Sequence, residues 1–326
     1  MKAALLRALK QAKGEYISGQ EISDILGVSR TTVFNTVSAL RTDGYEIESV
    51  KNKGYLLKKV PDIIKDYEVE SILETQWLGK KVVYEDSIGS TNTLAKELAD
   101  KGYDNGTVVI ADHQDNGRGR RGRSFVSPKG VGIFMSMILK PAFTPEVAPM
   151  LTLVSALSVS KAIDSVTGEK TQIKWPNDIV LNGKKICGIL TEMSMQTDYI
   201  NNVVIGIGIN VNNTQFSEEL QDIAGSIYLQ TNQLNHRADI IAQTLYYFEK
   251  YYNVFLETND LSGLVQEYDS KLVNLEKKVK VLDPKEPYEG VAKGITQTGE
   301  LIVQTNKTTS YVSSGEVSVR GMYGYV

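Results

Sequence analysis

Four arginines gather in one short stretch, Gly117–Arg123, with the sequence GRGRRGR. The stretch formally matches the dinucleotide fingerprint G-x-G-x-x-G, but that fingerprint needs a helix after its third glycine to meet the pyrophosphate. Here Ser127-Pro128-Lys129-Gly130 and a strand pattern follow instead. Arginine side chains in such a loop favour a polyanionic ligand, such as a nucleotide triphosphate or a developing acyl-phosphate. A solvated basic loop or a nucleic-acid contact is the alternative that charge alone leaves open.

Three further stretches contain lysines or glycines that could serve the same ligand as the arginine loop. Lys174–Asp178 (KWPND) joins the end of one predicted strand to the start of the next, and Lys185 stands at a strand mouth. Together with the arginine loop, these lysines can converge on one anion. The glycines of Gly206–Asn210 (GIGIN) allow a ligand or a neighbouring backbone to approach closely. Taken alone, each stretch is equally well explained as a turn or as packing glycine.

Alternating strand and helix patterns from Lys81 onward supply the scaffold for these residues. The apolar run Gly132–Leu139 (GIFMSMIL) is typical of a buried strand, and Met150–Val166 is typical of a long apolar helix. We therefore predict a mixed α/β domain of about 200 residues. The other predicted strands are 82–84, 107–112, 172–175, 179–181, 187–195 and 202–209, and the other predicted helices are 63–73, 91–101, 240–258 and 261–272.

The first sixty residues predict a winged helix-turn-helix. A helix over residues 3–11 and two helices opened by the capping residues Ser18 and Ser29 are followed by two strands around a basic turn at residues 52–54. Residues 1–60 contain ten Lys/Arg and six Asp/Glu, a balance of +4, whereas the rest of the chain contains 26 and 33, a balance of −7. A basic module on an acidic chain favours nucleic-acid binding. A small helical bundle that docks a protein partner is the alternative.

The geometry of this motif indicates which side chains would read DNA. The amino-terminal end of the second helix of a helix-turn-helix faces base edges in the major groove, and the tip of a hairpin can reach phosphate. The candidate DNA-binding residues are therefore Ser29, Arg30, Thr31, Thr32, Asn35, Lys51 and Lys53.

The final segment, from Val273 on, lacks a long helical pattern. Val279 and Val281 alternate with lysines, and glycines punctuate the short apolar runs that follow. This pattern is typical of a small, strongly bent β-barrel. The chain is accordingly divided into residues 1–62, 63–272 and 273–326.

The composition excludes several classes of protein and site. Of the 326 residues, 41% are hydrophobic and 23% are charged, which is close to the globular average and excludes a disordered or fibrous chain. No apolar run reaches the ~18 residues of a membrane span, and the first residues lack the pattern of a secretory signal. One cysteine, Cys187, and two histidines exclude an internal disulfide and a structural zinc site of the usual kind. We expect a cytoplasmic protein without membrane contact.

Five motifs stand in the order and spacing found in the biotin protein ligases. They are Gly89–Asn92 (GSTN), Gly117–Arg123, Lys174–Asp178, Lys184–Leu190 (KKICGIL) and Gly206–Asn210. With the amino-terminal winged helix, the whole chain resembles the bifunctional type, which is both the ligase and the biotin operon repressor. The resemblance implies an α+β multidomain fold with an N-terminal winged helix-turn-helix, a central mixed α/β biotin protein ligase catalytic domain and a small C-terminal SH3-like β-barrel.

The resemblance also implies a two-step reaction. Biotin and ATP-Mg²⁺ give biotinyl-5′-AMP and pyrophosphate, and a lysine of the biotin carboxyl carrier protein of acetyl-CoA carboxylase then takes the biotin as an amide. Both nucleophiles belong to substrates, so the enzyme supplies charge and positioning rather than a serine or cysteine nucleophile. The adenylate-bound homodimer is expected to repress biotin synthesis and transport genes at a palindromic operator.

Roles for individual residues follow from the same resemblance. The catalytic set is Lys185, Arg118 and Arg120. The biotin-binding set is Ser90, Thr91, Asn92, Gln114, Arg118, Arg120, Gly188 and Lys185. The ATP- and adenylate-binding set is Arg120, Arg121, Lys174, Asn177, Asp178, Asn210 and Arg320, with Asp178 on the Mg²⁺ side. Residues 211–224 match the loop that orders over the adenylate.

The chain departs from the family pattern at two places, and two other functions stay open. Phe125 stands where a tryptophan often follows the arginine loop, and residues 211–224 match poorly. One alternative is a non-catalytic biotin-sensing repressor, which would not require the full cationic set. The other is a lipoate-type protein ligase, which generally lacks the winged helix and the arginine-rich loop.

Overall fold

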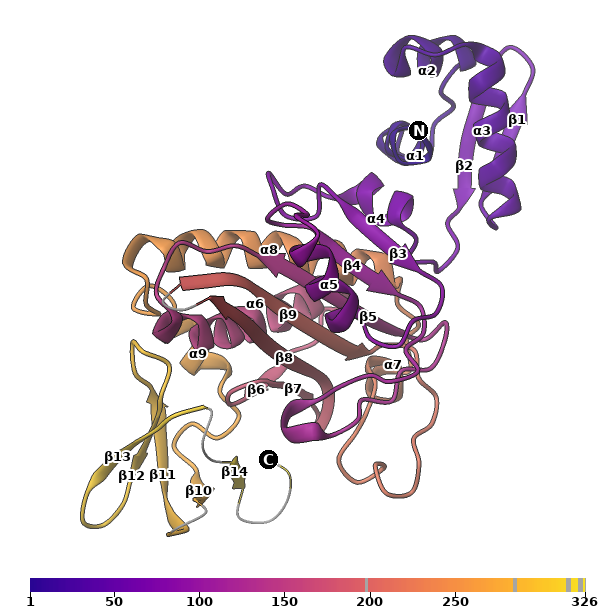
Figure 1. The fold of residues 1–326 in the computed structure, drawn as a ribbon. Helices are drawn as coiled ribbons and strands as arrows, with labels where there is room; N and C mark the ends of the chain where they lie inside the picture. Colours follow the sequence, from indigo (N-terminus) through magenta and orange to yellow (C-terminus); the bar gives the residue numbers. More distant parts are fainter. Residues whose placement is uncertain (197–198, 284–285, 315–317, 322–324, 326) are drawn as a thin grey trace.

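The N-terminal module is a winged helix-turn-helix, as the sequence predicts (Figure 1). The computed structural model describes the chain except for residues 197–198, 284–285, 315–317, 322–324 and 326. Both predicted helix caps are confirmed, because the backbone N–H of Glu21 donates to Ser18 Oγ (3.0 Å) and that of Thr32 donates to Ser29 Oγ (3.1 Å). The elements of the module are α1 (Lys2–Gln11), α2 (Gly19–Leu26), α3 (Arg30–Thr42), β1 (Glu46–Val50) and β2 (Gly54–Lys59).

The winged helix has its own apolar core, to which the following helix α4 (Asp66–Ile72) contributes Tyr67. Lys10 of α1 forms an ion pair with the buried Glu68 of α4 (2.5 Å). Tyr45 donates a hydrogen bond to the same carboxylate. The chain that leaves the winged helix therefore turns back and packs on it.

A seven-stranded sheet forms the centre of the protein, in the order β3-β4-β5-β9-β8-β7-β6. The pair β3–β4 is parallel, and the other neighbours are antiparallel. Every residue of β5 is buried, as its unbroken apolar run predicts. The strands are β3 (Val82–Glu85), β4 (Val108–Ala111), β5 (Gly132–Leu139), β6 (Gln172–Lys174), β7 (Asp178–Leu181), β8 (Lys184–Gln196) and β9 (Tyr199–Asn210).

Helices cover both faces of this sheet (Figure 1). On one face, α6 (Leu151–Thr167) packs against α8 (Arg237–Thr258) in the main core, and on the other α5 (Thr91–Asp100) packs over β4, β5 and β9. With η2 (Pro145–Met150), α6 is the one described helix long and apolar enough to cross a membrane, but 78% of its apolar stretch is buried inside the protein. It is therefore a core helix. The other helical elements are η1 (Arg120–Gly122), α7 (Ile227–Thr231) and α9 (Val265–Lys271).

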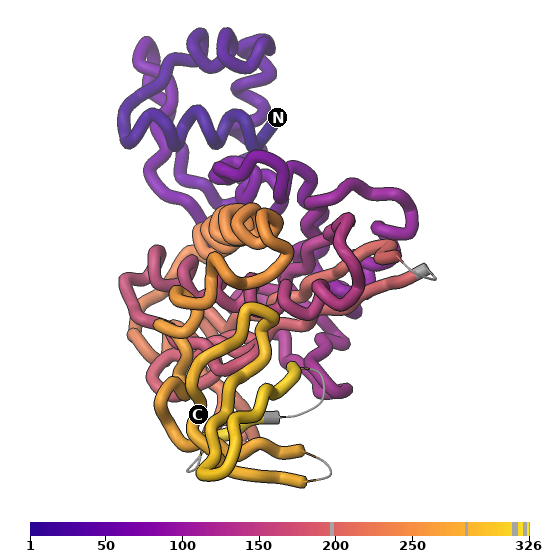
Figure 2. The backbone as a smooth tube through the Cα atoms, turned by 90° about the vertical axis from the view of Figure 1, so that its left-hand side faces the viewer, coloured from indigo at the N-terminus to yellow at the C-terminus, as the bar shows by residue number. Residues whose placement is uncertain are grey.

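The C-terminal segment forms a five-stranded antiparallel sheet, in the order β13-β12-β11-β10-β14. Among the described residues, β13 and β14 are its two edges and do not pair, so the structure supports a β-rich domain but not the closure of the predicted barrel. This sheet and the winged helix lie at opposite ends of the central domain (Figure 2). Its strands are β10 (Lys278–Leu282), β11 (Tyr288–Ile295), β12 (Leu301–Gln304), β13 (Thr309–Val312) and β14 (Ser318–Gly321).

Three helix predictions need correction. The helix expected over residues 63–73 begins only at Asp66, because the chain after Pro61 stays extended or bent. The helix expected over residues 261–272 begins at Val265, after a turn. The helix α7 was not expected, because its five residues are too few to show a periodic pattern.

A buried arginine at the start of α8 joins segments that are far apart in the chain. Arg237 is 2% exposed, and its guanidinium donates to Asp112 Oδ1 (2.6 Å), Asp62 Oδ2 (3.0 Å), the Asp62 carbonyl (3.0 Å) and the Gly132 carbonyl (3.1 Å). Its backbone N–H donates to Asp62 Oδ1 (2.9 Å). Asn212 also donates to Asp62 Oδ2 (3.1 Å). Arg237 and its partner Asp62 therefore join four separate parts of the chain. These are the linker after the winged helix, the end of β4, the start of β5 and the chain after β9.

We predict that Arg237→Met lowers the free energy of unfolding by about 3–5 kcal/mol, because it leaves two partly buried carboxylates without their cation. The matched control is Lys161→Met, which breaks the Lys161–Glu267 pair (2.9 Å) whose side chains are 36% and 37% exposed. An exposed pair of this kind contributes about 1 kcal/mol or less. Urea unfolding of both variants measures the difference, and equal losses would contradict a special role for Arg237.

Candidate active site

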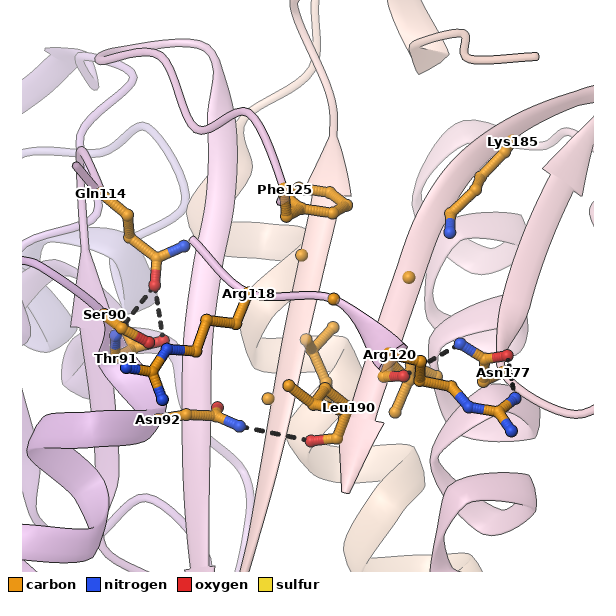
Figure 3. A pocket seen from close by; sticks show the side chains of 16 residues that line it. Ser90, Thr91, Asn92, Gln114, Arg118, Arg120, Phe125, Asn177, Lys185 and Leu190 are labelled. Carbon is orange, nitrogen blue, oxygen red and sulfur yellow. Dashed lines mark hydrogen bonds between the residues drawn. The ribbon is translucent and has the colours of Figure 1, made fainter. Parts of the chain in front are cut away.

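One pocket lies where the start of α5, the arginine loop, the first half of β8 and the second half of β9 meet (Figure 3). All members of the predicted biotin-binding set line it: Ser90, Thr91, Asn92, Gln114, Arg118, Arg120, Lys185 and Gly188. From the predicted nucleotide-binding set, Arg120 and Asn177 line the pocket. The members of that set outside its lining are Arg121, Lys174, Asp178, Asn210 and Arg320.

Uncharged hydrogen-bonding groups gather at one end of the pocket, and the Arg118 side chain points toward them (Figure 3). The backbone N–H and hydroxyl of Thr91 donate to Gln114 Oε1 (2.8 and 3.1 Å). Ser136 Oγ, which is buried in β5, lies 2.8 Å from Thr91 Oγ1 and 2.6 Å from Asn92 Oδ1. A Cβ at Gly206 would stand 2.1 Å from Asn92 Oδ1, so only glycine leaves room for this amide. This end suits a neutral ligand group that both donates and accepts hydrogen bonds.

The middle of the pocket is apolar, because the ring of Phe125 packs directly against two glycines. A Cβ at Gly208 would stand 2.7 Å from the ring of Phe125, and a Cβ at Gly188 would stand 3.5 Å from it. The same ring contacts Phe134 edge-on, with centroids 6.3 Å apart. Phe125, where the sequence departs from the family pattern, is therefore part of the pocket lining.

The opposite end of the pocket carries cations. Lys185 Nζ forms an ion pair with Asp178 Oδ1 (2.7 Å), and Arg120 donates to Asn177 Oδ1 (2.8 Å). Arg120 also donates to the carbonyl of Ser314, in the C-terminal part of the chain. Figure 3 shows Lys185 and Arg120 across the pocket from Gln114 and Ser90. A ligand that spans the pocket would therefore place its anionic end beside Lys185.

Lys174 lies next to this cationic end, under an aromatic ring that the sequence did not indicate. Its ammonium nitrogen is 3.3 Å from the centroid of Tyr325, and Tyr325 donates a hydrogen bond to the Asp178 carboxylate. Burial lowers the pKa of Lys174 to about 8, and the positive charges of Lys185 and Arg320 act in the same direction, against the attraction of Asp178. The predicted convergence of Lys174 and Lys185 is thus present, with Arg320 close enough to act on Lys174.

Residues 211–224 run beside Lys185. The Lys185 backbone N–H donates to the Ile223 carbonyl (2.8 Å), and the Lys185 carbonyl accepts from the Gly225 N–H (2.9 Å). Asn210 donates to the Gly225 carbonyl (3.1 Å), so its side chain holds the end of this loop and does not line the pocket. The loop is therefore positioned at the cationic end by backbone hydrogen bonds that a sequence pattern cannot show.

The predicted DNA-binding residues lie at the start of α3 and at the tip of the β1–β2 hairpin. Ser29 and Thr32 are engaged with each other in the helix cap, their hydroxyl oxygens 2.9 Å apart. Arg30 donates to Gln20 Oε1 of α2 (2.7 Å). The other four are exposed to solvent: Thr31, Asn35, Lys51 and Lys53.

Three family models match successive parts of the chain. An HTH domain matches residues 2–56, the biotin/lipoate A/B protein ligase family matches residues 84–210, and a biotin protein ligase C terminal domain matches residues 275–320. The bifunctional ligase/repressor BirA of Bacillus subtilis (strain 168) is 38% identical over 98% of this chain and 98% of its own. The chain belongs to the bifunctional ligase/repressor family. The BirA of Escherichia coli (strain K12) is 30% identical over 95% of this chain and 94% of its own.

Solved structures agree with this membership of the ligase/repressor family. The biotin protein ligase from Aquifex aeolicus, in complex with biotin and ATP, superposes with a TM-score of 0.67 and 30% identity. The match covers 74% of this chain and 99% of the Aquifex chain.

We predict that affinity for a triphosphate anion falls as the pH rises through the pKa of Lys174. Because that pKa is about 8, most Lys174 side chains lose their charge between pH 7 and pH 9, and the dissociation constant for inorganic tripolyphosphate should rise about 10-fold. Lys174→Arg keeps the charge over this range, so its dissociation constant should depend much less on pH. The same variant also serves as the control for protonation of tripolyphosphate itself. Calorimetric titration measures both, and the same pH dependence in the two proteins would contradict a role for Lys174.

Proposed function

We propose that this protein is an ATP-dependent biotin–protein ligase that also represses transcription of biotin synthesis and transport genes. The observation that carries the ligase function is a pocket with uncharged hydrogen-bonding groups and Arg118 at one end, the Phe125 ring over glycines in the middle, and Lys185 and Arg120 at the other end. Biotin has this same order of groups: a cyclic urea, an aliphatic ring and chain, and a carboxylate. The protein substrate is the biotin carboxyl carrier protein of acetyl-CoA carboxylase.

The reaction has two displacement steps. The biotin carboxylate attacks the α-phosphorus of ATP, and pyrophosphate leaves. The ε-amine of the carrier lysine then attacks the acyl carbonyl of biotinyl-5′-AMP and loses a proton, and AMP leaves. Neither step needs a nucleophile from the enzyme. Cys187 is fully buried and burial raises the pKa of its thiol, so it is not available as one.

The neutral end is assigned to the urea and ring of biotin. Ser90, Thr91, Asn92 and Gln114 supply the donors and acceptors that a urea carbonyl and its two N–H groups require. Ser136 holds Thr91 and Asn92 in place, and Thr91 in turn donates to Gln114, so these three side chains need little reorientation on binding.

The cationic end is assigned to the reacting groups. Lys185 bridges the biotin carboxylate and the α-phosphate, and its existing ion pair with Asp178 holds the ammonium in place before the substrates arrive. Arg118 and Arg120 close the loop over biotin and phosphate, while Gly188 leaves room for the Lys185 side chain, whose Nζ would lie 3.2 Å from a Cβ at that position. These cations lower the barrier by stabilising negative charge that develops during phosphoryl displacement.

The nucleotide is assigned to the groups beyond Lys185. Arg121, Lys174, Asn177, Asn210 and Arg320 are the proposed ATP and adenylate contacts. Asp178 would hold Mg²⁺ together with substrate phosphates, which is a common arrangement for this ion, and the bound ion would neutralise phosphate charge. Among the residues the structure describes, no three His, Cys, Asp or Glu side chains gather into a closed cage. A single carboxylate fits such an open, substrate-completed site, and Asp178 would exchange its bond to Tyr325 for the ion while keeping its ion pair with Lys185.

The repressor function is assigned to the winged helix. We propose that biotinyl-5′-AMP promotes a homodimer, so that two winged helices bind a palindromic operator in the cytoplasm. The division into residues 1–62, 63–272 and 273–326 and the closure of the last unit as an SH3-like barrel belong to the same proposal.

The ligase function predicts that radiolabelled pyrophosphate exchanges into ATP only when biotin is present, and that biotin then passes to an apo carrier domain. Lys185→Ala should lower the exchange rate roughly 100-fold or more, because it removes a donor that acts most strongly in the transition state. Lys170→Ala, at an exposed position outside the site, is the control and should be unaffected. Equal exchange with lipoate would contradict the substrate, and near-normal exchange by Lys185→Ala would contradict the role of that lysine.

The repressor function predicts that operator affinity and self-association rise together as biotin is added in the presence of ATP. Linkage requires this coupling, because a ligand that favours the dimer must also favour the state that binds both half-sites. Sedimentation and gel-shift measurements across a biotin titration test it. Operator affinity that stays constant from zero to saturating biotin would contradict the corepressor mechanism while leaving the ligase function intact.

A further inference from the structure

The predicted recognition helix α3 carries an aromatic side chain on its outer face. Phe34 is 56% exposed, although Val33, Val37 and Leu40 of the same helix are buried in the module core. Its ring contributes little to the stability of the fold, because its burial is incomplete. A single exposed apolar residue is ordinary on a protein surface. Evidence for a role of Phe34 must therefore come from the residues around it.

The neighbours of Phe34 on α3 are short polar side chains. Thr31 and Ser38 lie one helical turn away on the same face, and Asn35 follows directly. Thr31 and Asn35 are exposed, whereas Ser38 Oγ donates back to the Phe34 carbonyl (2.9 Å) and is used within the helix. The centre of this face is therefore apolar, with hydrogen-bonding groups around it.

The position of this face favours DNA as its partner. The helix α3 packs on α1, α2 and β1 (Figure 1), and Phe34 is exposed and not part of the module core. The module is basic, with ten Lys/Arg and six Asp/Glu in residues 1–60. Arg30, which is held by Gln20, lies one turn before Phe34, and Lys51 and Lys53 are exposed on the wing. Cations around a small apolar centre suit a groove lined by phosphate.

We propose that Phe34 contacts the 5-methyl group of a thymine in the major groove and so fixes one base of each operator half-site. The proposal rests on the operator-binding function proposed above. The thymine methyl is the apolar group that base edges offer in the major groove, and phenylalanine is among the side chains suited to contact it. Thr31 and Asn35 are then placed to hydrogen-bond to bases on either side of that thymine.

The experiment first obtains a binding site by selection from a random DNA library with the full-length protein, biotin and ATP. Each thymine of the selected half-site is then replaced in turn by deoxyuridine, in both half-sites at once, because uracil lacks only the methyl group. At one position the wild-type protein should lose roughly 10-fold in affinity, from about 4-fold for each methyl group that is no longer buried. Gel-shift titration measures the loss.

Two variants identify the side chain that is responsible. Phe34→Ala should bind thymine and uracil sites equally at that position, because the partner of the methyl group is gone. Ile25→Ala is the matched control, since Ile25 is 60% exposed on α2 of the same module, and it should keep the full difference between thymine and uracil. Unchanged far-UV circular dichroism and thermal unfolding of the full-length proteins show that both variants keep the winged helix folded.

The possible outcomes distinguish a failure of the thymine contact from a failure of the operator-binding function on which it rests. A selection that enriches no sequence contradicts operator binding itself. Enrichment with no position sensitive to uracil, or with the same sensitivity in wild type and Phe34→Ala, contradicts only the thymine contact. A Phe34→Ala protein that loses self-association but keeps the uracil effect would place this ring against protein and would also overturn the proposal.

Discussion

A guanidinium that is removed from water must have its charge and its N–H groups satisfied locally, and Arg237 meets this need with groups from segments far apart in the chain. Asp62 comes from the linker after the winged helix, Asp112 from the end of β4 and the Gly132 carbonyl from the start of β5. Asp112 directly precedes the loop that carries the arginines, and Asp62 is also bonded to Asn212 at the root of residues 211–224. One buried charge thus lies between the DNA-binding module and both loops that border the pocket.

The pocket also depends on glycines in the two strands that form one of its walls. Gly188 of β8 lies opposite Gly208 of β9, and Leu190 lies opposite Gly206. This register gathers three glycines in the lining of the pocket, where Phe125 and Asn92 approach the backbone too closely for any Cβ at the β9 positions. A shift of the strand pair by one residue would turn these positions to the other face of the sheet. The antiparallel pairing of β8 and β9 is therefore a condition of binding as well as of folding.

Local signals in the sequence were sufficient for most elements, whereas the residues that line the pocket were predicted from the resemblance to the biotin protein ligases. The strand Gly132–Leu139 has the predicted bounds, and the caps at Ser18 and Ser29 are present, because apolar runs and capping residues act over a few positions. Arg237, Ser136 and Tyr325 were missed, since each owes its place to partners far away in the sequence. The roles of Asn210 and the loop after it stay predictions, but the bonds that position them were not foreseen. The Asn210 side chain donates to the Gly225 carbonyl, and backbone hydrogen bonds join the end of the loop to Lys185, which is distant in the sequence. The open edges of the C-terminal sheet likewise depend on long-range pairing.

The burial of Cys187 has a practical consequence for measuring the interdomain distance of this protein by fluorescence. It is the one cysteine in the chain, it lies inside the central sheet, and its thiol resists ionisation. Thiol-reactive dyes require an accessible thiolate, so they should leave the native protein unlabelled. A pair of cysteines introduced on the surface, one on the wing and one on the central domain, would then carry fluorophores at those two positions alone. The distance between the two domains could be followed by energy transfer without first removing a native residue.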